Sequence, residues 1–111
     1  MPSYDYKFRV LVDTYNCLST YQFIAEQPAM TKYNKLTAEG YKCEIYPIKH
    51  NTDPNRADYE YRMFDIVELI NQFGMVLCAS EEEEPEFHGF KDDLESCFDY
   101  IDEYYYQKNN N

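Results

Sequence analysis

Carboxylates are the side chains whose type and spacing in this sequence most clearly offer a chemistry. From Ser80 to the C-terminus the chain has eleven Asp and Glu residues against two bases, Lys91 and Lys108. The preceding 79 residues have ten acids and eight bases, so the last third holds −9 of the formal net charge of −11. Charge asymmetry of this size is evidence about binding partners or solubility, and not about the fold. The chemistry on offer is electrostatic binding of a basic surface.

The spacing predicts a helix over residues 90–107 that shows these carboxylates on one face. Apolar side chains share the opposite arc of the helix: Phe90, Leu94, Cys97, Phe98, Ile101, Tyr104 and Tyr105. Six carboxylates lie between Asp92 and Glu103, over which the helix axis advances roughly 17 Å. The row they form therefore carries about one charge per 3 Å. One strand of B-DNA carries about one charge per 3.4 Å. The row therefore has the charge density of a nucleic-acid strand.

A predicted acidic loop, residues 80–88, precedes this helix and contains an EEEEPE run. Tyrosines follow at the other end, and tyrosine is enriched in the cores of protein interfaces. The predicted partner-binding residues are Glu81, Glu82, Glu83, Glu84, Glu86, Asp92, Glu95, Asp99, Asp102, Glu103, Tyr104 and Tyr106. The competing interpretation is that the carboxylates form a solvated face that only keeps the protein soluble.

The size, acidity and tyrosine content resemble those of phage-encoded nucleic-acid-mimic inhibitors of the anti-CRISPR and anti-restriction type. The resemblance implies a viral inhibitor, acting in the host cytoplasm, that occludes the basic groove of a nuclease or of a CRISPR or restriction effector. It implies no direct binding of nucleic acid, and it assigns no individual residue. A different function remains open: an acidic adaptor or subunit that meets a basic protein without displacing nucleic acid.

A second alternative is an enzyme. The stretch VLVDTYN, with Asp13 and Asn16 at the end of a predicted strand, is similar to the first-strand motif of PIN/NYN-type metal-dependent ribonucleases. That resemblance implies a divalent ion bound by Asp13. Without it, Asp13 is a strand-end residue that caps a turn. His50 and His88 have no Ser or Cys partner that the sequence places, and the Glu run lacks the spacing of a calcium loop. The leading interpretation therefore predicts no catalytic residue, metal or cofactor.

The periodicity predicts an α/β domain with a three-stranded sheet and three to four helices, in the order β-α-β-α-β-α. Strands are expected at 4–13, 41–48 and 75–79, and helices at 17–27, 28–39, 53–73 and 90–107. Long crossovers favour parallel strands. An α+β arrangement with one antiparallel strand remains open, because Pro28 and the alternation over 59–64 leave room for more strand. Residues 1–108 are expected to form one compact domain, and residues 109–111 a disordered tail.

The predicted first strand alternates, with Val10 and Val12 on a buried face and Arg9 and Leu11 on a wet one. The four cysteines fall one per predicted element with no CxxC pair, which favours buried, reduced thiols over disulfides. No apolar run approaches the roughly 18 residues of a membrane span. We therefore expect a cytoplasmic protein without a membrane segment.

Overall fold

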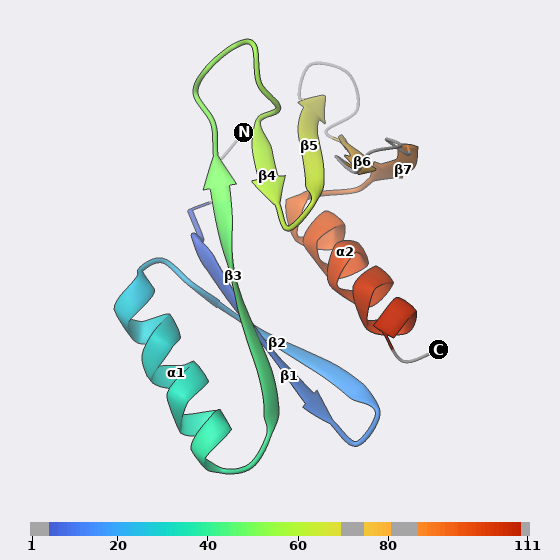
Figure 1. The fold of residues 1–111 in the computed structure, drawn as a ribbon. Helices are drawn as coiled ribbons and strands as arrows, with labels where there is room; N and C mark the ends of the chain where they lie inside the picture. Colours follow the sequence, from blue (N-terminus) through green and yellow to red (C-terminus); the bar gives the residue numbers. More distant parts are fainter. Residues whose placement is uncertain (1–4, 70–74, 81–86, 110–111) are drawn as a thin grey trace. The chain divides into compact units, whose positions relative to one another are not determined.

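The computed structural model describes residues 5–69, 75–80 and 87–109 (Figure 1). The chain divides into two compact units, Asp5–Ile48 and the part that begins at Lys49. We call them the N-terminal unit and the acidic unit. The N-terminal unit has five acids and five bases, whereas the acidic unit has sixteen of the 21 acids and five of the ten bases. The net charge of −11 therefore belongs entirely to the acidic unit.

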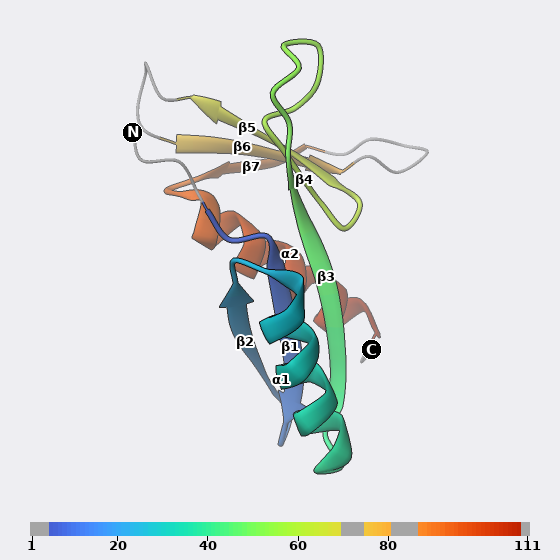
Figure 2. The same cartoon turned by 90° about the vertical axis from the view of Figure 1, so that its left-hand side faces the viewer.

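The N-terminal unit is a three-stranded antiparallel sheet with one helix packed on it (Figure 2). Its elements are β1 (Phe8–Thr14), β2 (Cys17–Phe23), α1 (Glu26–Ala38) and β3 (Lys42–His50), whose last two residues enter the acidic unit. β1 lies between β2 and β3. Val10 and Val12 of β1 pack against Ala29 and Leu36 of α1 in the core. The strand predicted at 4–13 is thus confirmed from Phe8 on, and the strand predicted at 41–48 and the helix predicted at 28–39 are confirmed as β3 and α1.

The helix predicted at 17–27 is wrong, because this segment is β2. Tyr15 and Asn16 connect β1 to β2 and have φ angles of 50° and 67°. Two residues with positive φ form the turn that matches the twist of a β-hairpin, and asparagine tolerates this conformation well. Thr14 then pairs with Cys17, and the register continues to Phe8 opposite Phe23. The two-residue turn was the signal that the helical interpretation missed.

Helix α1 ends in a Schellman motif at the glycine that the sequence predicted as its terminator. The amide of Tyr41 donates to the carbonyl oxygen of Leu36 at 3.1 Å, and that of Gly40 donates to Thr37 at 3.0 Å. Gly40 has a φ of +94°, which favours glycine. These bonds satisfy two carbonyl groups that the helix end would otherwise leave unpaired.

Replacing this glycine is expected to cost stability through the backbone alone. A Cβ atom at Gly40 would meet nothing within 4 Å, so no steric clash contributes. Gly40→Ala should lower the free energy of unfolding by about 1 kcal/mol, and Gly40→Asn by less, because asparagine tolerates positive φ. Urea unfolding measures both values. Equal stability of wild type and Gly40→Ala would contradict the strained conformation.

The acidic unit is built from four antiparallel strands and one helix (Figure 1). The strands are β4 (Tyr59–Tyr61), β5 (Phe64–Leu69), β6 (Met75–Ser80) and β7 (Phe87–Lys91), paired in that order, and the helix is α2 (Leu94–Asn109). The strand predicted at 75–79 is confirmed as β6. Its neighbours are antiparallel, whereas parallel ones were expected.

The helix predicted at 53–73 is wrong where the structure describes it, because β4 and β5 form a hairpin. Tyr59, Tyr61, Phe64 and Ile66 are all buried, two from each strand. Arg62 lies in the turn with a φ of 57°. Buried residues alternate within each strand, but Tyr61 and Phe64 are three residues apart across the turn. The combined spacing therefore resembles that of a helix. Gly74, the predicted helix terminator, lies outside the described residues.

The fold class is α+β, and the described residues contain seven strands and two helices. The three-stranded sheet with three to four helices and the order β-α-β-α-β-α are therefore wrong. The antiparallel pairings replace the expected parallel crossovers, because two-residue turns connect β1 to β2 and β4 to β5. The α+β alternative named the correct class, and the alternation over 59–64 was its correct signal, but its single antiparallel strand is wrong because the pairings above are all antiparallel.

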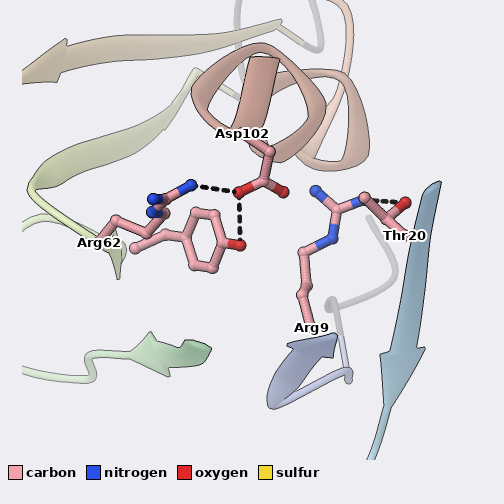
Figure 3. Close-up of polar contacts among 5 residues, drawn as sticks. Arg9, Thr20, Arg62 and Asp102 are labelled. Atoms are coloured by element: carbon pink, nitrogen blue, oxygen red, sulfur yellow. Dashed lines mark hydrogen bonds and ion pairs between the residues drawn. The ribbon is translucent and has the colours of Figure 1, made fainter. Parts of the chain in front are cut away.

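Three further expectations concern the outer face of β1, the cysteines and membrane spans. Arg9 and Leu11, predicted on a wet face of β1, are 1% and 2% exposed; Nη2 of Arg9 donates to Oγ1 of Thr20 at 3.2 Å (Figure 3). Cys17, Cys43 and Cys97 form no disulfide; Cys97 is buried as expected, whereas Cys17 is exposed. Within the described ranges, no helix has the length and apolar character that crossing a bilayer requires.

Candidate functional site

Helix α2 begins at Leu94, four residues later than predicted, because Phe90 and Lys91 belong to β7. Asp93 is its N-cap: Oδ1 accepts a hydrogen bond from the amide of Ser96 at 2.8 Å. This bond, together with a side-chain bond from Ser96, lowers the pKa of Asp93 below its ordinary value of 3.8. The carboxylate of Asp93 therefore stabilises the helix.

Removing this cap is expected to lower stability in a pH-dependent way. Asp93→Ala should lower the free energy of unfolding by about 1 kcal/mol near neutral pH. Because the folded-state pKa is depressed, the contribution of the carboxylate is complete above about pH 4 and is lost as the pH falls through the folded pKa. Asp93→Asn keeps a cap but removes this part of the acid dependence. Urea unfolding at neutral and acidic pH tests both, and equal acid dependence of wild type and Asp93→Asn would contradict the assignment.

Three carboxylates form an exposed stripe along α2. Glu95, Asp99 and Glu103 are exposed and follow each other at intervals of four residues. Their spacing along the axis is about 6 Å, twice the predicted interval. Asp92 is also exposed and lies just before the helix. We call Glu95, Asp99 and Glu103 the acidic stripe.

Asp102, predicted on this exposed face, is buried. It is 1% exposed, and Oδ1 accepts hydrogen bonds from the Tyr61 hydroxyl at 2.7 Å and from Nη1 of Arg62 at 3.1 Å (Figure 3). The Arg62 side chain is 8% exposed, so the ion pair is largely desolvated. At 100° per residue, Asp102 lies about 40° from Phe98, at the border of the apolar arc. That position was the signal that sequence reasoning missed.

Tyrosines form a second row on α2, beside the acidic stripe. The rings of Tyr100 and Tyr104 stack at 23° with centroids 6.4 Å apart. Tyr104 also packs edge to face against Phe64 and His88, with centroid distances of 5.7 and 5.2 Å. Tyr106 is half-buried. His88, predicted in a loop, lies in β7, with Nδ1 hydrogen-bonded to the Tyr100 hydroxyl at 2.7 Å.

An open groove of about 560 Å³ lies beside the tyrosine row and Glu103, the last carboxylate of the acidic stripe. Its lining residues are Tyr100, Glu103, Tyr104, Gln107 and Lys108. We call it the tyrosine groove. A carboxylate and aromatic rings in one groove suit a cationic ligand, because the ring faces attract positive charge.

The predicted acidic loop adds nothing to this geometry. Glu81, Glu82, Glu83, Glu84 and Glu86 lie outside the described residues. Ser80 ends β6, and residues 87 and 88 belong to β7. The carboxylates that the structure places are therefore those of α2 and the residues just before it.

The structure places Asp13, the residue on which the nuclease alternative rests, near the end of β1. Asp13 lies in an antiparallel hairpin, opposite Leu18, and no helix follows β1. The ring of His50 stacks on Tyr59 with centroids 4.6 Å apart. Among the described residues, no three His, Cys, Asp or Glu side chains gather closely enough to hold a metal ion.

Comparisons of this chain with protein-family models, with curated proteins and with solved structures found no match. Any function must therefore be argued from the charges and geometry above. Both family resemblances, to nucleic-acid-mimic inhibitors and to PIN/NYN nucleases, stay predictions.

Proposed function

We propose that this chain is a non-enzymatic binding protein whose acidic unit occupies a basic, nucleic-acid-binding groove of a target protein and inhibits it. The observation that carries the proposal is the distribution of charge. All of the net charge of −11 falls on one of the two units, and three of its carboxylates line one exposed side of α2. Such a surface attracts basic partners and repels nucleic acid itself.

The arrangement of the stripe supports a role in binding. Like charges four residues apart, as in Glu95 with Asp99 and Asp99 with Glu103, each destabilise an isolated helix by about 0.2 to 0.5 kcal/mol. A face that serves only solubility mixes lysines into these positions, and α2 has just one, Lys108 near its end. A basic partner would place further cations beside this face.

The mechanism is competition. The field of the acidic unit steers it toward a basic groove, and the carboxylates then neutralise lysines and arginines that would otherwise contact phosphates. Because Asp102 is buried in its internal ion pair, the exposed row is sparser than a B-DNA strand. The field of the whole unit contributes more to this mimicry than a strand-like alignment of single charges. In the phage-encoded class that the composition resembles, the target would be a nuclease or a CRISPR or restriction effector of the host.

Salt-dependent capture tests the proposal. The immobilised protein should retain a nucleic-acid-binding protein from host lysate at about 50 mM salt and release most of it by about 200 mM, because neutralisation of several charges makes binding steeply salt-dependent. Capture of no basic protein, or capture that does not respond to salt, would contradict the proposal and favour a face that only maintains solubility.

A further inference from the structure

Helix α2 already binds one guanidinium group of its own unit. Cζ of Arg62 lies 4.1 Å from the centroid of the Tyr105 ring, and Nη1 lies 3.1 Å from Oδ1 of Asp102. Asp102 and Tyr105 are three residues apart and are therefore neighbours on the helix surface. A carboxylate and a tyrosine ring together provide what a guanidinium prefers, a hydrogen-bond acceptor and a flat π face.

The tyrosine groove presents the same two groups toward solvent. Glu103 and Tyr104 line this groove together, and the ring of Tyr104 stacks beside Tyr100, which lies three residues from Glu103. Nε2 of Gln107 donates to Oε1 of Glu103 at 2.8 Å and so orients the carboxylate. The groove volume of about 560 Å³ is within the range of small-molecule sites. The groove is therefore large enough for a side chain of a partner.

Two lysines of the acidic unit show that these ring faces accept cations. Nζ of Lys91 lies 4.0 Å from the centroid of Tyr100 and also donates to the carbonyl oxygen of His88 at 2.8 Å. Nζ of Lys108 lies 5.8 Å from the centroid of Tyr104, near the limit of a cation–π contact. Lys108 is exposed and in the last turn of α2. It is the weakly held cation of the pair and the one that a stronger ligand would displace.

We propose that the tyrosine groove takes an arginine side chain of the basic partner, which replaces Lys108 over Tyr104 and pairs with Glu103. This inference rests on the proposed function, because a partner with a basic surface must supply the arginine. Arginine is favoured over lysine because the planar guanidinium stacks on a ring while donating two hydrogen bonds to a carboxylate. A lysine ammonium can also lie over a ring and donate hydrogen bonds, but it cannot stack flat on the ring while donating two parallel hydrogen bonds to one carboxylate.

The test compares binding of fluorescent deca-arginine and deca-lysine peptides, which have equal length and charge, by anisotropy at about 150 mM salt. Wild type should bind deca-arginine about fivefold more tightly, which corresponds to one cation–π contact with its hydrogen bonds. Glu103→Gln should reduce this preference, whereas Glu95→Gln, the same change elsewhere on the stripe, should not. Lys108→Ala should increase the affinity for deca-arginine more than Arg56→Ala, an equal charge change in an exposed loop residue.

Tyr104→Leu should abolish the preference and Tyr104→Phe should keep it. Tyr104 also packs on Phe64 and His88, so circular dichroism checks whether its variants fold. If the Tyr104 variants misfold, the variants of the exposed residues Glu103 and Lys108 test the proposal. Equal affinity of wild type for both peptides, or equal effects of Glu103→Gln and Glu95→Gln, overturns the arginine site but leaves the electrostatic function standing. Failure of both peptides to bind contradicts the proposed function itself.

Discussion

Neutralising the acidic stripe is expected to weaken the complex with the basic partner about 3- to 150-fold at low salt. The triple variant Glu95→Gln, Asp99→Asn, Glu103→Gln removes three exposed charges, and an exposed ion pair contributes roughly 0.2 to 1 kcal/mol. Most of the loss should appear in the association rate, because these charges steer the encounter. Surface plasmon resonance with the captured partner measures both rate constants.

The N-terminal unit offers a matched control. Glu26, Glu39 and Glu44 are exposed there, and changing all three to Gln removes the same number of charges from the whole chain. If the acidic unit carries the binding, this variant should bind within about twofold of wild type at about 150 mM salt, where charges outside the contact surface are largely screened. Equal losses in the two triple variants would mean that only the total charge matters.

Removing the buried carboxylate of Asp102 is expected to destabilise the acidic unit by about 3 to 5 kcal/mol. Asp102→Ala leaves the guanidinium of Arg62, 8% exposed, without this carboxylate, and breaking a buried ion pair from one side has a cost of that size. It also removes the acceptor of the Tyr61 hydroxyl. Chemical denaturation with urea, followed by circular dichroism, gives the free energy of unfolding.

Two comparisons make this result specific. Glu103→Ala changes the neighbouring, exposed carboxylate and should alter stability by no more than about 0.5 kcal/mol. The double variant Arg62→Met, Asp102→Leu removes both charges and should be more stable than Asp102→Ala alone, because an apolar pair avoids the unpaired buried charge. If Asp102→Ala and Glu103→Ala cost the same, Asp102 does not hold the unit together.

The sequence predicted elements well where one period ran undisturbed. Strand β1, helix α1 with its terminating Gly40, and the apolar run of β6 lie close to where hydrophobic spacing placed them. It failed at the two hairpins, where positive φ at Asn16 and at Arg62 reverses the chain within two residues. No glycine stands at either turn, so composition gave little warning.

The candidate site was likewise predicted correctly only where the helical period decides which side chains are exposed. The helical period correctly separated exposed Glu95, Asp99 and Glu103 from the apolar side of α2. It could not place Asp102, because a border position becomes buried or exposed according to its partner. Arg62, 40 residues away in the chain, is that partner, and only the tertiary structure brings the two together.

The measurement that tests the central claim most directly is a competition titration. The captured partner is loaded with a labelled nucleic acid that it binds, and the protein is added in increasing amounts while the bound label is followed by anisotropy. A nucleic-acid mimic should release the label completely and saturably, and the acidic-stripe variant should require a much higher concentration. A ternary complex that retains the label would contradict the mimic and identify the protein as an adaptor.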